Sequence, residues 1–310
     1  MAAKPRIAIV GAGNFGSALA VSLRRAGYTI KPVIARSPGA SLKKAQRLAT
    51  EVGARAIAGS FVGATAELIW FCVPDGEIAR AARWLSQDPR PFDSLRAGSL
   101  AKNARRKGHP ELDWKGRVAL HSSGALASDE LAVLRERGAS VASVHPMMTF
   151  VRGSRPSLAG VSFAIEGDRA AVRWARRIVK DLGGHAFAIR KKDKAAYHAW
   201  GTFASPLFTA LLATTEQVAA TAGVARKAAK RRMIPILLQT LANYAAFDAG
   251  SAFSGPIVRG DVDTVKRHLR MLADAPTARE VYTALARAAL LYLPAKRKSE
   301  LSKVLESREN

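Results

Sequence analysis

Lys194 and His198 form the side-chain pair best suited to supply a proton to a substrate. Residues 193–206 are predicted to be helical, and a spacing of four places both side chains on one helix face. An amine whose pKa is lowered by burial can protonate the alkoxide that develops when a hydride reaches a carbonyl carbon. The spacing leaves open that Lys194 is an ordinary exposed lysine, or that His198 donates the proton itself. Ser205, further along the helix, is a candidate substrate contact.

A glycine spacing near the start of the chain indicates a second kind of chemistry. Gly11, Gly13 and Gly16 follow the apolar run 7–10 and precede a helical pattern. In a strand–turn–helix unit, this G-x-G-x-x-G spacing lets a pyrophosphate approach the backbone at the positive end of the helix. We therefore predict a dinucleotide site in which Asn14 and Phe15 also contact the cofactor.

The residues after the second predicted strand favour NADP(H) over NAD(H). A typical NAD site has an acidic residue about twenty positions past the glycines, where it binds the ribose 2′-hydroxyl. This chain has Arg36 and Ser37 at that place. A guanidinium and a hydroxyl suit a 2′-phosphate. The alternative is that Arg36 is an ordinary exposed arginine at a strand end.

Small and polar residues follow three further predicted strands. Ligands of an open parallel sheet lie outside the carboxyl ends of its strands, which makes residues at these positions candidates for the site. The predicted cofactor contacts are Val73, Pro74, Asp75 and Ser122, and the predicted substrate contacts are Ser123, Gly124 and His145. Asp75 could also, or instead, cap the helix that starts near residue 77. His121 and His145 both end strands, where a histidine either contacts substrate or serves the local structure.

The positioning of these residues requires a sheet that brings strand ends together, and the hydrophobic pattern predicts one. Apolar β-prone runs alternate with amphipathic helical patterns up to about residue 190, which predicts an α/β fold with a Rossmann-type, doubly wound, mostly parallel sheet. An all-α C-terminal domain follows, with helices at about 193–222, 227–248, 261–273 and 276–292. We expect a kink at Pro206 and a frayed end over the last dozen residues.

The sequence therefore divides into an NADP-binding domain over residues 1–190 and a helical substrate and dimerisation domain over 191–310. The first domain is expected to carry a basic loop insertion at about 88–116. The alanine-rich helices of the second half present more apolar surface than one bundle normally exposes, which predicts a homodimer.

Composition limits the partners and the compartment. The 310 residues include 49 Lys and Arg against 24 Asp and Glu, a net charge of +25. This excess raises nucleic acid or another polyanion as a partner, but the basic residues are spread along helices, so we expect a solvated surface. Cys72 is the single cysteine, which argues against a disulfide or a metal site and fits a cytoplasmic protein. No apolar run approaches the roughly 20 residues of a membrane span.

Taken together, these motifs resemble the family of Rossmann-like proteins with a helical DUF2520 domain. The matching features are the Gly11/Gly13/Gly16 turn and residues 73–75, 121–126, 143–146, 193–198, 203–205 and 255–261. The resemblance implies an NADPH-dependent oxidoreductase that reduces a small 2-oxo or 3-oxo acid resembling ketopantoate. It also places Lys194 and His198 where the related β-hydroxyacid dehydrogenases carry a catalytic Lys-x-x-x-Asn pair. Pro206 departs from the family, in which asparagine is frequent at this position.

Two other functions remain open on the sequence alone. The protein could bind NADP without catalysis, as a sensor or interaction protein that uses the basic insertion. It could also be an imine reductase of the pyrroline-5-carboxylate reductase type, which shares the expected layout.

Overall fold

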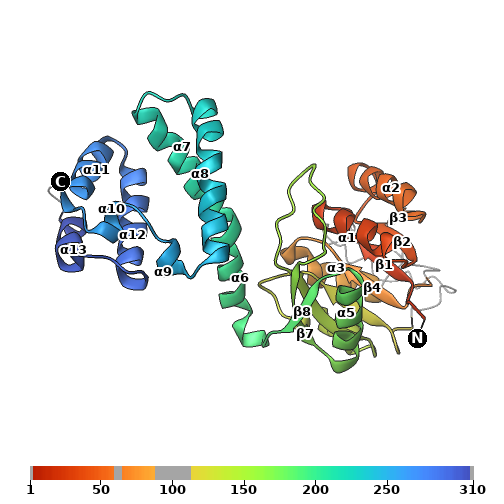
Figure 1. Cartoon of the computed structure of the whole chain (residues 1–310). Coiled ribbons are helices and arrows are strands. Elements are labelled where there is room, and N and C mark those ends of the chain that lie inside the picture. Colours follow the sequence, from red (N-terminus) through yellow and green to blue (C-terminus); the bar gives the residue numbers. More distant parts are fainter. Residues whose placement is uncertain (1–2, 59–64, 88–112, 308–310) are drawn as a thin grey trace, which may run out of the picture. The chain divides into compact units, whose positions relative to one another are not determined.

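The computed structural model describes residues 3–58, 65–87 and 113–307, and it consists of two compact units, Met1–Thr202 and Phe203–Asn310 (Figure 1). Residues 88–112 of the predicted basic insertion lie outside the described residues. The first unit extends past the join predicted near residue 190. It does so because the helix Lys194–Thr202 is anchored to the sheet through its buried residues Lys194 and Tyr197.

An eight-stranded sheet forms the centre of the first unit, in the order β3-β2-β1-β4-β5-β6-β7-β8. Neighbouring strands are parallel except β6 and β7, which pair antiparallel. The chain runs outward from β1 to β3 and then crosses to β4 on the other side of β1, which makes the gap between β1 and β4 the topological switch point. The strands are β1 Ile7–Val10, β2 Ile30–Ala35, β3 Ala56–Ala58, β4 Leu68–Phe71, β5 Val118–His121, β6 Ser140–Pro146, β7 Ser162–Gly167 and β8 His185–Ala188.

Helices cover both faces of this sheet, as the continuous apolar strands require. Successive strand residues point to opposite faces. Thus Ile7 and Ile9 pack in a core with α1, α2 and α5, whereas Ala8 and Val10 pack in a second core with α3. The helices of the first unit are α1 Asn14–Arg25, α2 Ala40–Val52, α3 Ile78–Gln87, α4 Ala132–Arg135, α5 Arg169–Asp181 and α6 Lys194–Thr202. The predicted fold class, a doubly wound sheet followed by helices, is confirmed.

The second unit is helical in its described residues. A core that includes Val265, Leu269 and Leu290 joins three of its helices, α11, α12 and α13. By contrast, α7 has no buried residue and α8 buries only Ala229. The helices are α7 Phe208–Thr221, α8 Arg226–Ala246, α9 Ala249–Ala252, α10 Pro256–Arg259, α11 Val262–Met271, α12 Pro276–Tyr292 and α13 Lys298–Glu306. None of the helices in the described ranges has both the length and the hydropathy needed to cross a membrane.

Two sequence predictions concern a kink within these helices and the end of the last one. The helix expected over 193–222 is interrupted by a π-helical turn at Phe203–Leu207, which contains Pro206. Proline lacks an N–H and clashes with the carbonyl one turn before it, so a widened turn at this position agrees with the predicted kink. The prediction of a frayed end is wrong for most of the last dozen residues, because Leu301, Val304 and Leu305 are buried on α13.

Candidate cofactor and substrate site

The turn between β1 and α1 has the backbone that a dinucleotide requires. Gly11 has a φ of 101°, and a Cβ there would lie 2.6 Å from the carbonyl oxygen of Cys72. A Cβ on Gly16 would lie 2.2 Å from the carbonyl oxygen of Gly11. A Cβ on Gly13, by contrast, would meet no atom within 4 Å. Two glycines therefore let α1 pack closely on the strands. The third leaves open backbone at the N-terminus of α1, where a pyrophosphate could approach.

The two residues between these glycines are engaged within the protein. The Nδ2 of Asn14 donates to the carbonyl oxygen of Phe150 at 3.1 Å. The rings of Phe15 and Phe150 pack edge to face, with centroids 5.0 Å apart. These contacts tie the start of α1 to the segment after β6. Contact of Asn14 and Phe15 with a cofactor stays a prediction.

Arg36 and Ser37 follow β2 at the same sheet edge as the glycine turn. Strands β1 and β2 are parallel, with Val10 paired to Ile34, so Arg36 emerges beside Gly11. The Arg36 side chain is exposed. Ser37 accepts a hydrogen bond at its carbonyl oxygen from the Ser41 hydroxyl, at 2.6 Å. The residues from 36 to 39 include no carboxylate, so this edge has the charge that a 2′-phosphate needs.

His121 is a structural residue rather than a ligand. The backbone N–H of Ser123 donates to its Nδ1 at 3.1 Å, so the ring proton lies on Nε2, which donates to the carbonyl oxygen of Ala127 at 2.9 Å. Burial, together with the charge of Lys194, lowers the pKa of His121 to about 4. Both ring nitrogens are hydrogen-bonded to backbone groups of the turn after β5. Of the two interpretations from the sequence, substrate contact or local structure, the second therefore applies to His121.

Asp75 and the two serines after His121 connect neighbouring strand ends. The Ser123 hydroxyl donates to Asp75 at 2.8 Å and accepts from the backbone N–H of Leu126 at 2.9 Å. Ser122 accepts a hydrogen bond from Nε1 of the buried Trp70 at 2.8 Å. The alternative that Asp75 caps a helix is not supported, since the short 3-10 helix Asp75–Glu77 has Pro74 as its N-cap and no side-chain cap. Val73 and Pro74 lead into this cluster at the end of β4.

Lys194 lies beneath this cluster, in the protein interior. Its side chain is 1% exposed, and its Nζ donates to the carbonyl oxygen of Ser123 at 3.0 Å and to the hydroxyl of Ser143 at 2.7 Å. Burial lowers the pKa of Lys194 to about 8, against the opposing charges of Glu166 and Asp75. The amine therefore supports the turn from inside, and the alternative of an ordinary exposed lysine is wrong.

Two histidine rings meet over Gly124. A Cβ on Gly124 would lie 2.7 Å from Cδ2 of His198 and 2.9 Å from Nε2 of His145. The ring centroids of the two histidines are 6.3 Å apart. The hydroxyl of Tyr197 lies 2.7 Å from Nδ1 of His145. Burial, followed by the charges of Lys194, His198 and His121, lowers the pKa of His145 to about 4.

Sequence reasoning missed Tyr197. This residue is 6% exposed on α6, one turn after Lys194. Residues three apart share a helix face, and that spacing could have identified it once Lys194 was a candidate. By contrast, Ser205 belongs to the second compact unit, and its predicted substrate contact stays a prediction.

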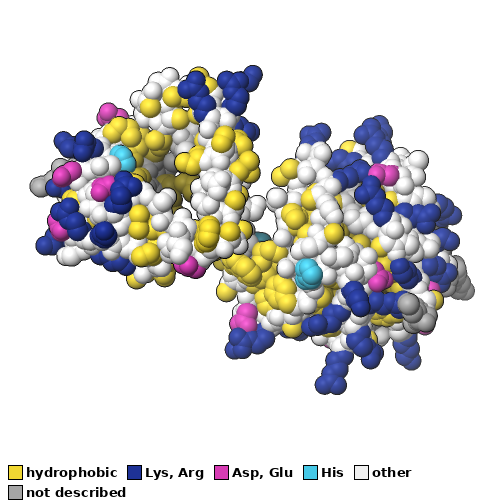
Figure 2. Space-filling view, in the orientation of Figure 1, with side chains coloured by type: hydrophobic (Ala, Val, Ile, Leu, Met, Phe, Trp, Pro, Cys, Tyr) yellow, Lys and Arg dark blue, Asp and Glu magenta, His cyan; other side chains and the backbone are white. Residues whose placement is uncertain are grey.

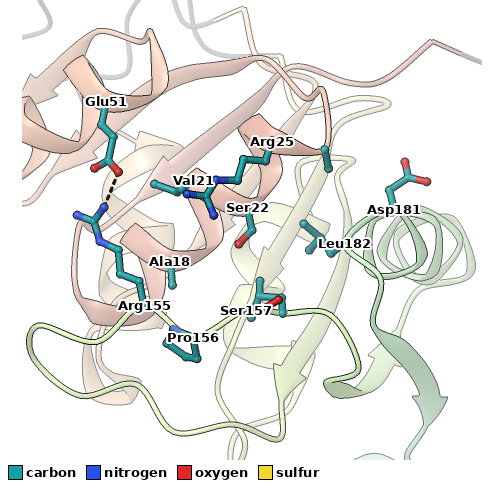
Figure 3. Close-up of a pocket in the computed structure, with 12 residues that line it drawn as sticks. Ala18, Val21, Ser22, Arg25, Glu51, Arg155, Pro156, Ser157, Asp181 and Leu182 are labelled. Carbon is teal, nitrogen blue, oxygen red and sulfur yellow. Dashed lines mark hydrogen bonds and ion pairs between the residues drawn. The ribbon is translucent and has the colours of Figure 1, made fainter.

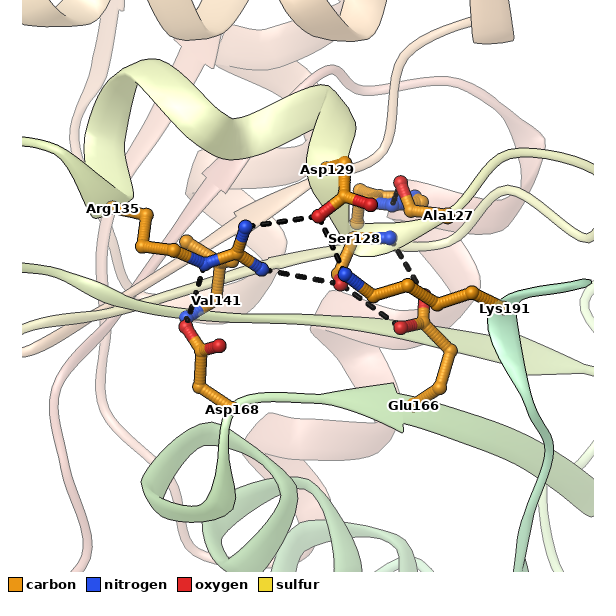
Figure 4. A network of polar contacts seen from close by, with 9 residues as sticks. Ala127, Ser128, Asp129, Arg135, Val141, Glu166, Asp168 and Lys191 are labelled. Carbon is orange, nitrogen blue, oxygen red and sulfur yellow. Dashed lines mark hydrogen bonds and ion pairs between the residues drawn. The ribbon is translucent and has the colours of Figure 1, made fainter.

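A polar network behind the site holds the 3-10 helix Ser128–Leu131 in place (Figure 4). The buried Glu166 on β7 accepts from the backbone N–H of Ser128 at 2.6 Å and from its hydroxyl at 2.9 Å. Asp129 pairs with Arg135 at 2.9 Å and with Lys191 at 2.5 Å. Because Lys191 leads directly into α6, the network fixes the start of this helix next to the turn after β5.

A hollow of about 500 Å³ lies elsewhere on the first unit, lined by residues of α1, α2, the segment 155–158 and the end of α5 (Figure 3). Arg155 and Glu51 form an ion pair across it. None of the predicted site residues lines this hollow. In the ranges that the structure describes, no group of three or more His, Cys, Asp or Glu residues could hold a metal ion.

Comparisons with solved structures support the fold. The chain is similar to the protein BF3122 from Bacteroides fragilis, provisionally described as an NADP oxidoreductase, with 20% identity, a TM-score of 0.70, and coverage of 92% of this chain and 97% of that one. An imine reductase from Pseudomonas sp. is 22% identical, with a TM-score of 0.59 and coverage of 98% and 100%. A reductive aminase from Aspergillus terreus, solved with NADPH and ethyl-5-oxohexanoate, is 16% identical, with a TM-score of 0.60 and coverage of 97% and 99%. At these identities the likeness shows the fold.

Family models complete the comparison. No curated protein matches the sequence. Residues 1–146 match the model of the Rossmann-like domain, and residues 161–289 match the domain of unknown function DUF2520. The second match begins just before β7, so it includes the last strands of the sheet as well as helices. The chain belongs to the proteins in which a Rossmann-like domain is followed by a DUF2520 domain.

Proposed function

We propose that this protein is an NADPH-dependent reductase of a small 2-oxo or 3-oxo acid. The observation that carries the proposal is the open backbone of Gly13 at the N-terminus of α1, with the exposed Arg36 at the same sheet edge. This combination fits a pyrophosphate and a 2′-phosphate. When bound, NADPH supplies a hydride. The reductive aminase of similar fold has been solved with NADPH, which agrees with this choice of cofactor.

The substrate would lie near the two histidines over Gly124. We assign proton donation to His198, whose side chain is exposed and whose ring has no hydrogen bond among the described residues. Lys194 has a different role from direct proton transfer, because its Nζ already donates to Ser123 and Ser143 in the interior. Its positive charge under the turn attracts an anion, which favours an acid as the substrate.

A cyclic imine is the second candidate substrate, and Asp75 is the observation that favours it. Its carboxylate is exposed at the site and accepts a hydrogen bond from Ser123 at 2.8 Å, so it could pair with a cationic iminium. Two proteins of similar fold are described as an imine reductase and a reductive aminase. A non-catalytic NADP sensor is the third candidate, and its basic insertion lies largely outside the described residues.

The test has two stages. NADPH and NADH are first titrated in parallel by nucleotide fluorescence, and NADPH consumption is then measured with a panel of oxo acids and cyclic imines. We expect tight NADPH binding, turnover of an oxo acid, and at least about a tenfold loss of kcat in His198→Gln. His185→Gln, the same change at an exposed residue on β8, is the matched control. NADPH binding without turnover would favour the sensor, and turnover of imines alone would favour the second candidate.

We further propose a homodimer formed through the second unit, in the cytoplasm. Apolar side chains on α8 are exposed, including Ile236 at 67%, Leu238 at 62% and Tyr244 at 66%. Figure 2 shows hydrophobic side chains at the surface of the second unit. Apolar surface on this scale is a feature of interaction sites. Light scattering at micromolar concentration should give twice the mass of the chain, and Leu238→Asp should give a monomer. A monomeric wild-type protein would contradict this proposal.

A further inference from the structure

The ring of His145 makes an asymmetric set of contacts. On one side, its Nδ1 lies 2.7 Å from the hydroxyl of Tyr197, and the two rings are nearly perpendicular, at 86°. On the other side, Nε2 faces Gly124, 2.9 Å from where a Cβ would be. Within the described ranges no hydrogen bond reaches this Nε2, in contrast to His121, whose two ring nitrogens are both bonded.

The Tyr197 hydroxyl has one proton and two acceptors within reach. The backbone carbonyl oxygen of His145 lies at 3.4 Å, whereas Nδ1 of the same residue lies at 2.7 Å. The shorter contact is close to the ideal length for a hydroxyl donor, and the longer one is beyond it. Donation to Nδ1 therefore gives the hydroxyl proton the closer of its two acceptors. A neutral imidazole that accepts at Nδ1 carries its proton on Nε2.

Burial and the nearby positive charge of Lys194 keep His145 neutral, with its pKa near 4. A neutral ring with one fixed proton is a directional donor, whereas a ring with mixed tautomers is not. The packing of Tyr197 supports this fixed orientation, because its ring contacts Phe187 at a centroid distance of 6.0 Å and Trp200 at 6.2 Å. Tyr197 itself is 6% exposed, so it has little freedom to turn away.

We propose that Tyr197 is a positioning residue that holds His145 in the Nε2–H tautomer, so that His145 donates a hydrogen bond to an acceptor oxygen of the ligand above Gly124. This inference rests on the proposed function for the identity of the ligand, a carbonyl or carboxylate of an oxo acid. The tautomer itself depends only on contacts within the first unit, and it exists without substrate or cofactor.

The test is long-range proton–nitrogen NMR on the full chain labelled with ¹⁵N at its six histidines. His145→Gln assigns the signals of His145. We expect wild-type His145 to show a protonated Nε2 and an unprotonated Nδ1 at pH 7. In Tyr197→Phe this pattern should change to a mixture of tautomers or to Nδ1–H. Tyr282→Phe is the matched control, because Tyr282 makes a comparable contact with Nδ1 of His268 at 3.1 Å in the second unit.

A wild-type signal with the proton on Nδ1 would overturn the proposal, and so would an unchanged tautomer in Tyr197→Phe. If Tyr197→Phe does not fold, the wild-type spectrum alone still decides the tautomer. An enzyme assay separates this inference from the proposed function. A protein that shows the expected tautomer but reduces no oxo acid would refute the proposed function alone. If it is active, Tyr197→Phe should lower kcat/KM at least about tenfold and Tyr282→Phe should not.

Discussion

The substitution Gly13→Ala should separate cofactor binding from folding. Gly13 is the N-cap of α1 with φ of −76° and ψ of −173°, an extended conformation that alanine adopts without strain. A Cβ at this position would touch nothing within 4 Å in the protein. An added methyl group should therefore leave the folded chain intact and occupy the space that the pyrophosphate would need.

Opposing terms keep the stability of Gly13→Ala close to that of the wild type. Alanine is a poorer N-cap than glycine by a few tenths of a kcal/mol up to about 1 kcal/mol. Alanine also restricts the unfolded chain, which returns about 0.4–1 kcal/mol. The free energy of unfolding should thus change by less than about 1 kcal/mol. A methyl group between the backbone and the phosphates weakens charge-assisted hydrogen bonds of about 1.5–3 kcal/mol each, so NADPH affinity should fall at least about tenfold.

Gly16→Ala is the contrasting control, because its Cβ would lie 2.2 Å from the carbonyl oxygen of Gly11 and 3.0 Å from Cβ of Cys72. Backbone cannot move aside cheaply, so we expect a loss of about 3 kcal/mol or more of stability. Urea denaturation measures the stability of both variants, and NADPH fluorescence titration measures binding. Wild-type affinity in a stable Gly13→Ala protein would refute the assignment of this turn, and a Gly16→Ala protein as stable as the wild type would refute the packing argument.

Three further predictions follow from the same contacts. Arg36→Ala should lower NADPH affinity at least about tenfold and leave NADH affinity within about twofold, as measured by parallel titration; an equal loss for both would contradict the 2′-phosphate assignment. The pKa values of His121 and His145 are near 4 in the folded chain and 6.5 in the unfolded one, so the unfolded chain binds more protons between these values and stability should fall as the pH drops from 6.5 to 4. Urea denaturation across this window should show a decrease of up to about 3 kcal/mol per ring, which His121→Asn reduces, and a flat profile would refute the neutral rings. Gly124→Ala should lower turnover at least about tenfold with NADPH binding preserved, since the new methyl group would crowd His145; wild-type turnover would contradict the placement of the substrate.

The parts of the fold that depend on local pattern were predictable from the sequence. Helices cover both faces of the sheet, so the strands are largely continuous apolar runs, and these runs indicated the strands. The spacing of three glycines was enough to identify the first turn. The α13 helix was also predictable, since Leu301, Val304 and Leu305 have helical spacing. The charged residues around them led to the wrong prediction of a frayed end.

The chemistry of single side chains was less predictable because it depends on distant partners. Lys194 is buried by contacts with Ser123, 71 residues away, and Ser143, 51 residues away. No spacing rule within one helix contains that information. The sequence did not distinguish the two strand-end histidines. In the structure, both ring nitrogens of His121 form hydrogen bonds within its own turn, whereas Nε2 of His145 faces Gly124. The difference arises at Nε2, which in His121 meets the carbonyl oxygen of Ala127 and in His145 has no hydrogen-bond partner among the described residues.

The buried amine of Lys194 helps to keep the rings of His121 and His145 neutral. The charge of Lys194 lowers the pKa of both His121 and His145, so removing it should raise both values. An anionic ligand near the rings would oppose the effect of Lys194, because a negative charge stabilises protonated imidazole. Binding of an oxo acid should therefore raise the pKa of His145, whereas the corresponding neutral ester should not. This coupling would let substrate charge, rather than shape alone, decide how strongly His145 binds an acceptor oxygen of the ligand.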